Sequence, residues 1–497
     1  MTPTIIGFVT FLLGAYVLIR WRSPLLILCL VLVAGMFQSS AVAILTAVGG
    51  STITPPRFLL LFLFISVAAA VSTRASLLRE AVTENAPLLI FCLYGVLSAL
   101  LLPRIFAGQI YVFPLRPTGL RNLYDTFPLA PTSQNITTAI YLAGTGLTAL
   151  CAYIAARLAR DVTPLVKTGI FIGLTHSLIG ILGVTLAGTQ WDLVVEFVRN
   201  ASYSQLSQEA SGMVRMAGFA AEPSVYANFA GPWFIFLVEL WLRDVSRRWT
   251  GFSALVVMVV LVLSTSSSAY VLLAGYGLIL LLRMLAFPHY MTAGKLTTIA
   301  LLGIGGLLVL LGIYLSSARF AQQFGDMFQQ MTVGKSDSES GLQRMFWAMQ
   351  GVDAFVVSNG LGIGAGSFRS SSLIMAILGS MGVIGLVTFG LYCLSLLRIF
   401  GRSANRVDHM RGSLSEACIW AALIGLLPAL IIGPSPDPGM EFAIFAALGL
   451  ALRYPRWQAD HDDTLQLVDE YRPERRSLAP VTAQEVPQSG GWRRFSR

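Results

Sequence analysis

The chain has 497 residues, of which 55% are hydrophobic and only 12% are charged. An ordinary globular protein has roughly 45–50% apolar and about 25% charged residues, so this composition excludes a soluble protein. Apolar blocks of about 15 to 25 residues alternate with short Arg-bearing segments, as in polytopic membrane proteins. The net charge of +9 is concentrated at the ends of these blocks and therefore indicates topology rather than a nucleic-acid partner.

Cysteine and histidine indicate no metal site. The five Cys residues lie inside apolar blocks without a CxxC spacing, and the four His residues are widely scattered. We therefore predict neither a metal nor another cofactor, and we interpret His176, inside an apolar segment, as a core residue. No basic region precedes the first apolar block, so we expect that block to be a retained helix rather than a cleaved signal peptide.

A membrane-spanning helix needs about 20 predominantly apolar residues. On this criterion we predict an all-α bundle of about thirteen (12–14) transmembrane helices. The predicted segments are 3–19, 24–48, 57–72, 86–102, 135–156, 164–187, 222–242, 250–264, 267–285, 293–316, 371–397, 413–432 and 438–453. The pair 250–264 and 267–285 is separated only by a Ser/Thr run, so these two segments could instead form one hairpin buried in the bundle.

The basic residues are distributed asymmetrically between the two sets of loops. Sixteen lie in short loops on one side, and ten lie on the other. The sixteen are Arg20, Arg22, Arg74, Arg79, Arg157, Arg160, Lys167, Arg243, Arg247, Arg248, Arg283, Lys295, Arg398, Arg402, Arg406 and Arg411. The positive-inside rule places these in the cytoplasm and the N-terminus outside. The polar tail 455–497 follows the 1–454 membrane domain, and we expect it to be cytoplasmic and disordered.

Three predicted outer loops are long, at residues 103–134, 188–221 and 317–370. Long loops in a compact helical bundle usually carry function, because they cost ordering entropy without adding to the core. The sequence therefore places the chemistry at the outer face of the membrane.

The third long loop contains an amphipathic segment followed by a glycine run. Residues 340–343 resemble a capping box, and apolar residues follow at helical spacing: Leu342, Met345, Phe346, Met349 and Val356. This pattern predicts a helix on the membrane surface, with Arg344 in its first or second turn. The alternative role for Arg344 is a snorkelling side chain at the interface.

The glycine run extends from residue 360 to 366 and is followed by Arg369. Gly362, Gly364 and Gly366 could present backbone N–H groups to an anion, and Arg369 would add charge. The alternative is a flexible turn, since the strand and helix that flank a nucleotide-binding loop are missing from the pattern.

The second long loop ends in a polar segment, where Arg215 precedes Glu222 and Pro223. Pro223 suits the first turn of a helix, so Glu222 could serve only as a helix cap. With Arg344 and Arg369 predicted on the same side of the membrane, however, these residues form a candidate site for a lipid-linked diphosphate.

Several further residues are candidates for the same chemistry. Arg57 is expected at the outer face, where it could bind phosphate or only mark the membrane boundary. Asp437 and Glu441 lie where the chain enters the last predicted helix and are alternatives to Glu222 as a general base, although a solvated turn with a carboxylate at the helix start explains them as well.

Three motifs resemble the O-antigen polymerase and ligase family over residues 200 to 450. They are Arg344-x-x-Trp347, the run from Gly360 to Phe368, and the segment Leu378–Gly385 in the next helix. The segment Gly218–Ser224 is similar to one in polysaccharide polymerases. The resemblance implies a GT-C-like bundle and a metal-independent glycosyltransferase. Its reaction would transfer glycan from undecaprenyl diphosphate to an acceptor sugar at the periplasmic face, in exopolysaccharide, capsule or O-antigen biosynthesis.

One departure separates the alternatives within that family. The ligases place a His where this chain has Ser371 and Ser372, so the resemblance favours a Wzy-type polymerase, which joins lipid-linked repeat units, over a ligase or oligosaccharide transferase. We assign diphosphate binding to Arg215, Arg344 and Arg369, assisted by the glycine run and Arg57, and proton abstraction to Glu222.

The expected partners are an undecaprenyl-diphosphate-linked oligosaccharide and membrane lipid, with a chain-length regulator and a flippase as further candidates, and no nucleic acid. A transporter or flippase is the alternative from another class. It would have ionisable residues in the middle of its helices and an internal repeat, and only Glu239 approaches such a position.

Overall fold

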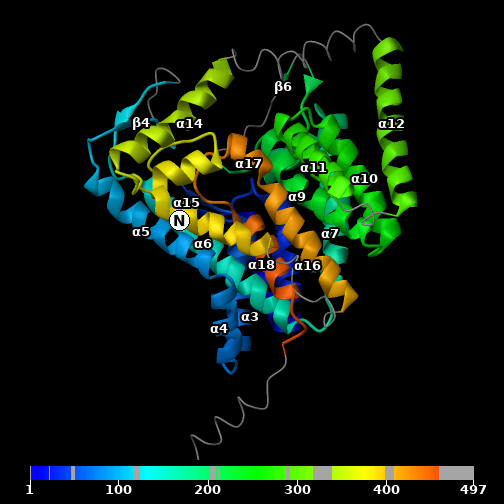
Figure 1. Ribbon diagram of the computed structural model, residues 1–497, viewed down its shortest axis with the longest axis horizontal. Coiled ribbons are helices and arrows are strands. Elements are labelled where there is room, and N and C mark those ends of the chain that lie inside the picture. The colour runs from blue at the N-terminus through cyan, green and yellow to red at the C-terminus, as the bar shows by residue number, and fades with distance from the viewer. Residues whose placement is uncertain are drawn as a thin grey trace, which may run out of the picture. The chain divides into compact units, whose positions relative to one another are not determined.

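The computed structural model describes residues 2–21, 23–45, 51–115, 124–201, 209–210, 213–286, 292–316, 339–397 and 408–457. The chain divides into two units, Met1–Trp457 and Gln458–Arg497. The second unit, and with it nearly all of the tail predicted to be disordered, lies outside the described residues. The first unit is predominantly helical, with only short strands (Figure 1).

Each predicted apolar segment contains a helix. The main helices are α1 (Ile5–Trp21), α2 (Pro24–Ala34), α3 (Pro55–Val71), α5 (Ala86–Ile105), α6 (Ser133–Leu158), α7 (Thr163–Thr185), α9 (Pro223–Leu242), α10 (Arg247–Leu263), α11 (Ser267–Ala286), α12 (Ala293–Ser316), α15 (Leu373–Leu397), α16 (His409–Gly425), α17 (Leu427–Ile432) and α18 (Met440–Leu452). Three further helices are α4 (Ala75–Glu84), α8 (Trp191–Val198) and α14 (Glu339–Val357).

Seven helical segments among the described residues are long and apolar enough to cross a membrane. They are Ala86–Ile105, Ser133–Leu158, Thr163–Thr185, Pro223–Leu242, Ser267–Ala286, Leu373–Leu397 and His409–Ile432. The other apolar helices, including α1, α2, α3 and α18, are shorter. The structure is therefore that of an all-α membrane protein, as the composition predicts.

The segment predicted as a helix over 24–48 is in fact shorter. Helix α2 ends at Ala34, a 3-10 turn η1 (Gly35–Phe37) follows, and strand β2 (Ala43–Leu45) then pairs with β1 (Thr2–Pro3) and β3 (Ser51–Ile53). This small sheet lies against the start of α1, where a Cβ on Gly7 would come within 2.2 Å of the Val42 carbonyl oxygen. Apolarity alone could not separate these residues from the helix, because both are buried.

Two helices of the bundle are interrupted. The segment predicted over 413–432 divides into α16 and α17 at Leu426, just before Pro428, whose ring cannot continue a regular helix. Helix α15 is kinked at Gly382, which has φ 58° and ψ −150°. The chain that follows α17 meets the turn that precedes α15, where the Ser370 N–H donates to the Pro434 carbonyl oxygen.

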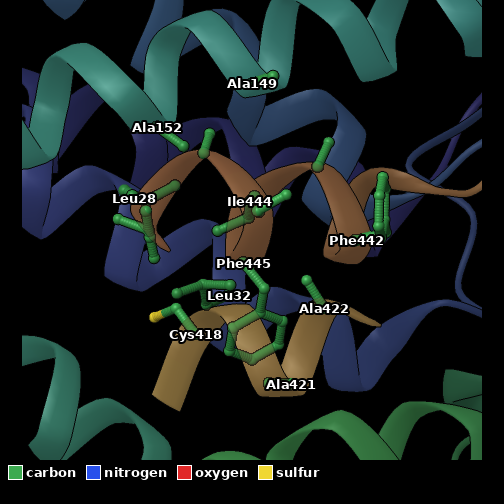
Figure 2. Packing of buried hydrophobic residues seen from close by; sticks show 14 of the residues in the cluster. Leu28, Leu32, Ala149, Ala152, Cys418, Ala421, Ala422, Phe442, Ile444 and Phe445 are labelled. Carbon is green, nitrogen blue, oxygen red and sulfur yellow. The ribbon is translucent and has the colours of Figure 1, made fainter. Parts of the chain in front are cut away.

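Helix α18 is the centre of the core. Its residues from Phe442 to Leu452 are all buried, and it packs between α6 and α16 (Figure 2). Small side chains such as Ala149 and Ala422 face it and allow the helices to approach closely, as is common in membrane bundles.

The helix directions define two ends of the bundle. Helices α3, α6, α9, α15 and α18 begin at one end, which we call the site end, and α2 and α5 end there. Ion pairs are concentrated at the opposite end, where Arg157 pairs with Glu80 and Lys295 with Asp244. This end carries the basic loops that the sequence predicts to be cytoplasmic.

Glu239 belongs to this opposite end and is fully buried. Its carboxylate pairs with Arg243 and Arg283, both at 2.5 Å, and accepts a hydrogen bond of 2.8 Å from the Tyr276 hydroxyl. The one candidate transport carboxylate is therefore neutralised within a structural network joining α9 and α11.

We expect Glu239→Ala to lower the free energy of unfolding by about 3–5 kcal/mol, because it removes the buried carboxylate that pairs with Arg283 and one of the two carboxylates that pair with Arg243. Glu416→Ala is the matched control: Glu416 also pairs with Arg243, but its side chain is 42% exposed. The control should lose about 1 kcal/mol or less. Thermal unfolding of the purified variants in detergent measures both, and equal losses would contradict the structural role of Glu239.

Helix α14 is the amphipathic helix that the third long loop predicts. Its apolar residues Met345 and Val356 are 65% and 66% exposed, while Gln343 and Gln350 on another face are buried against the protein. An exposed apolar face of this kind is typical of a helix lying at a membrane surface.

Candidate functional site

Glu222 stands at the N-terminus of α9. It occupies the N-cap position with extended backbone angles, and Pro223 takes the first position of the helix. Its partly buried carboxylate accepts a hydrogen bond from the Ser224 hydroxyl. The carboxylate is therefore oriented by the helix start, where the positive end of the helix dipole stabilises its charge.

Arg215 lies seven residues before Glu222, and its side chain is held by the turn between α10 and α11. Its guanidinium donates to the Thr265 carbonyl oxygen at 3.1 Å, in the turn between α10 and α11, and its buried Nε has no hydrogen-bond partner. Burial lowers the pKa of Arg215, and the negative charge of Glu222 acts in the opposite direction. Arg215 therefore remains a cation that is only partly satisfied by the protein.

Arg369 lies just before α15 and is fixed at both its backbone and its side chain. Its N–H donates to the Phe113 carbonyl oxygen at 2.9 Å, and its guanidinium carbon lies 4.5 Å from the ring centre of Trp347 in α14. Arg369 Nε and Trp347 Nε1 are both buried and have no hydrogen-bond partner among the residues that the structure describes. Two neighbouring donors of this kind could be satisfied together by one anion with several oxygens.

Arg344 joins the same group from α14. The Ser371 hydroxyl donates to the Arg344 carbonyl oxygen at 2.5 Å, which ties α14 to the start of α15. Burial lowers the pKa of Arg369; the charge of Glu222 raises it, and that of Arg344 lowers it. Arg369 is therefore within electrostatic range of both residues.

The structure thus brings together residues from three separate segments of the chain. Glu222 acts electrostatically on both Arg215 and Arg369, and Arg344 acts on Arg369. None of the three Arg residues forms an ion pair with any residue that the structure describes. We call Arg215, Glu222, Arg344 and Arg369 the arginine cluster. Its excess of positive charge, beside apolar helices, suits an anionic ligand with an apolar part.

The glycine run has a different role from the one expected. Gly362 N–H donates to Ser358 Oγ at 2.8 Å, and Gly364 N–H donates to the Ser380 carbonyl oxygen at 3.0 Å, next to the kink of α15. These amides, expected to face a diphosphate, are thus used within the protein. Gly366 packs so closely on α6 that a Cβ would lie 2.5 Å from the Gln134 carbonyl oxygen. The run docks α14, α6 and α15 together and thereby sets the position of Arg369.

We expect Gly362→Ala to destabilise the protein and to disturb this docking. Gly362 has φ 87°, and a Cβ would lie 2.4 Å from the Ser380 carbonyl carbon. The strained backbone alone costs about 1–3 kcal/mol, and the clash adds to that cost. Gly144→Ala, in α6 where nothing lies within 4 Å of the added Cβ, should be tolerated. Thermal unfolding in detergent compares the two, and equal stability would contradict the docking role.

Arg57 belongs to a second polar group at the site end. Its guanidinium carbon lies 3.9 Å from the ring centre of Tyr141 in α6, and its charge acts on Glu441 in the first turn of α18. Gln38 donates a hydrogen bond to the Glu441 carboxylate. No described contact joins Arg57 directly to the arginine cluster, so its predicted phosphate contact is separate from the other three.

Asp437 and Glu441 do not lie in a solvated turn, which was the alternative explanation for these two carboxylates. Asp437 is partly buried and accepts hydrogen bonds from the Thr145 hydroxyl at 2.8 Å and the Gly439 N–H at 3.1 Å. Those contacts fix the loop before α18 against α6. The same loop meets the arginine cluster's segment, because Ser370 N–H donates to the Pro434 carbonyl oxygen at 3.1 Å.

His176 is a core residue, as interpreted from the sequence. Its ring stacks on Tyr226 with centroids 4.0 Å apart, and Nε2 lies 3.3 Å from the Tyr226 carbonyl oxygen. Among the described residues, no group of His, Cys, Asp and Glu could hold a metal ion.

Sequence reasoning missed the groups that position the cluster. Trp347 is part of the Arg344-x-x-Trp347 motif but was given no role from the sequence, whereas in the structure its ring stacks against the Arg369 guanidinium. Phe113, whose carbonyl holds Arg369 and whose ring lies 5.2 Å from that of Trp347, had no signal at all. Thr265 was noted only as part of a polar break. A carbonyl acceptor is available at any residue type, so such roles leave no pattern in the sequence.

The fold and the site define an all-α membrane protein with an arginine-rich polar cluster at one end of its helix bundle. No protein-family model matches the chain, and no curated protein is significantly similar to it. The resemblance to O-antigen polymerases and ligases therefore depends on the motif residues alone.

Proposed function

We propose that this chain is a membrane glycosyltransferase that polymerises glycan repeat units carried on undecaprenyl diphosphate. The observation that carries the proposal is the arginine cluster: three cations without acidic ion-pair partners among the described residues, one carboxylate, and two buried unpartnered donors at Arg369 and Trp347. A diphosphate has the oxygens and the negative charge that such a cluster can bind. The adjoining apolar helices suit its lipid.

The proposed reaction is a displacement at the anomeric carbon of the donor sugar. The acceptor hydroxyl oxygen forms the new glycosidic bond, while the bond to the diphosphate oxygen breaks and the diphosphate leaves with the electron pair. Arg215, Arg344 and Arg369 stabilise the charge that develops on this leaving group. Glu222 takes the proton of the acceptor hydroxyl.

Glu222 is preferred as the base because its charge acts directly on two of the three cations. Asp437 already accepts hydrogen bonds from Thr145 and Gly439, and Glu441 is engaged with Gln38. The buried pairing of Glu239 at the opposite end favours an enzyme over a transporter, because it leaves that carboxylate a structural role.

The membrane topology is part of the proposal. We propose that the apolar helices form a GT-C-like bundle with about thirteen spans, in which the shorter helices cross where the bilayer is locally thinned. The site end then faces the periplasm, and the end with the ion-paired basic loops faces the cytoplasm, with the N-terminus outside and the C-terminus inside.

The deciding experiment is reconstitution of the full-length protein in liposomes with undecaprenyl-diphosphate-linked repeat units. The expected product is a ladder of longer lipid-linked glycans. A product formed only when lipid A core or an acceptor protein is added would identify a ligase or an oligosaccharide transferase instead. Movement of the lipid-linked unit across the bilayer without elongation would identify a flippase and overturn the proposal.

A further inference from the structure

An apolar groove lies on the surface of the bundle near the site end. It has a volume of about 350 Å³ and runs between α1, α2, α3 and α8. Its walls include Ile6, Val9, Leu13, Val33, Leu59 and Phe197. Thr10 is the one polar residue among those that line it, and its hydroxyl donates to the Ile6 carbonyl oxygen of its own helix at 2.7 Å. The groove therefore offers no free hydrogen-bonding group and suits a hydrocarbon.

The groove meets the segment that carries Glu222. Phe37, at one end of the groove, stacks on Phe219 with centroids 5.6 Å apart, three residues before Glu222. At the α8 side, Arg199 follows the groove residue Val198 and donates to the Ala221 carbonyl oxygen at 2.8 Å. Two separate contacts thus join the groove to the segment between Arg215 and Glu222, which are both members of the arginine cluster.

We propose that this groove binds the polyprenyl chain of the lipid-linked diphosphate; the inference rests on the proposed function. A lipid whose diphosphate is held by the arginine cluster must place its chain on an adjoining apolar surface, and the groove is connected to the cluster's segment by the two contacts above. The three cations suit a diphosphate better than the single charge of a phosphodiester lipid. The groove has room for only part of a long chain, and the remainder lies in the bilayer.

Because the chain enters the groove from lipid rather than from water, selectivity comes from close packing and not from the hydrophobic effect. Filling the groove should therefore weaken binding modestly and only for ligands with a long chain. Leu13→Trp places a bulky ring in the groove, whereas Leu12→Trp is the same substitution at the adjacent residue of α1, which does not line it. The two side chains are similarly exposed, at 42% and 51%.

The experiment titrates full-length protein in phospholipid nanodiscs with C55 polyprenyl diphosphate and with geranyl diphosphate, followed by native mass spectrometry. We expect Leu13→Trp to weaken binding of the long-chain probe by about threefold or more, since part of the packing surface is lost. Binding of geranyl diphosphate, and both titrations of Leu12→Trp, should match the unsubstituted protein.

The outcomes separate the two proposals. If Leu13→Trp and Leu12→Trp bind the long-chain probe equally, the groove assignment is wrong while the diphosphate site stands. If the unsubstituted protein binds neither probe, the diphosphate site itself, and with it the proposed function, is wrong.

A photocrosslink gives a second measurement that does not depend on how a tryptophan is tolerated. A benzophenone amino acid at Val9, which lines the groove, should give an adduct with the polyprenyl diphosphate, whereas one at Phe8, which is exposed outside the groove, should not. If the residue at Val9 crosslinks only to phospholipid even when the polyprenyl diphosphate is present, ordinary lipid occupies the groove and the inference is overturned.

Discussion

Replacing Arg369 by alanine is expected to lower the rate of glycan transfer by about 10²–10³-fold, the usual effect of removing a donor that stabilises transition-state charge. Arg369 is the member of the cluster on which both Glu222 and Arg344 act, and it holds a buried Nε without a partner beside Trp347. Its loss would leave the departing diphosphate without its best-oriented cation. The measurement is the initial rate of elongation in proteoliposomes at matched protein amounts.

Two further variants make this result specific. Arg104→Ala removes an exposed arginine from the end of α5, at the same end of the bundle, whose side chain donates only to the Leu100 carbonyl of its own helix, so its rate should be unchanged. Arg369→Lys keeps the charge but loses the planar fork and its stacking on Trp347, and should fall between the two. An Arg369→Ala protein that elongates as fast as Arg104→Ala would show that the cluster does not bind the diphosphate.

The second large effect is expected at Glu222. Glu222→Gln removes the proposed proton acceptor and should lower the elongation rate by about 10²–10⁴-fold. The amide oxygen can still accept the hydrogen bond from Ser224, so the start of α9 should remain intact. Binding of the lipid-linked donor should be retained, and single lipid-linked units should accumulate. Product ladders and donor binding are measured on the same preparations.

Glu441→Gln is the matched control for the identity of the base. Glu441 also stands at the start of a helix at the site end, but it is engaged with Gln38 and lies near Arg57 rather than near the arginine cluster. We expect its elongation rate to stay close to that of the unsubstituted protein. A loss in Glu441→Gln together with normal elongation in Glu222→Gln would transfer the role of base to Glu441.

Much of the helical architecture could be predicted from the sequence, because burial in a bilayer requires long apolar runs. The predicted segment 293–316 matches α12, and 267–285 matches α11 to within one residue. Where the prediction over 24–48 was too long, the described residues after Ala34 form a 3-10 turn and a short strand, Ala43–Leu45, and apolarity alone does not distinguish such a strand from a helix. The interruption at Leu426 was not predicted, because Pro428 lies inside an otherwise continuous apolar run.

The residues of the candidate site could be named from the sequence, but the contacts that position them could not. Low overall charge made the few arginines of the long loops conspicuous, and Arg215, Arg344 and Arg369 are brought into one electrostatic group with Glu222. The glycine run was conspicuous for a different reason: four glycines at alternate positions, from Gly360 to Gly366, adopt positive φ so that the turn can pack directly on α15 and α6. A pattern that indicates an anion loop is also what close backbone packing requires.

The sequence by itself determined that this chain belongs in a membrane, because the bilayer excludes charge from long apolar segments. It also determined the positions of most helices along the chain and which set of loops carries few charges. Only the tertiary structure decided which of those few charges meet and which are already paired. Glu239 is neutralised by Arg243, at the end of α9, and by Arg283 in α11, whereas Arg369 keeps a buried donor that has no hydrogen-bond partner in the described part of the chain. That distinction depends on contacts between segments far apart in the chain, and the packing of helices sets those contacts.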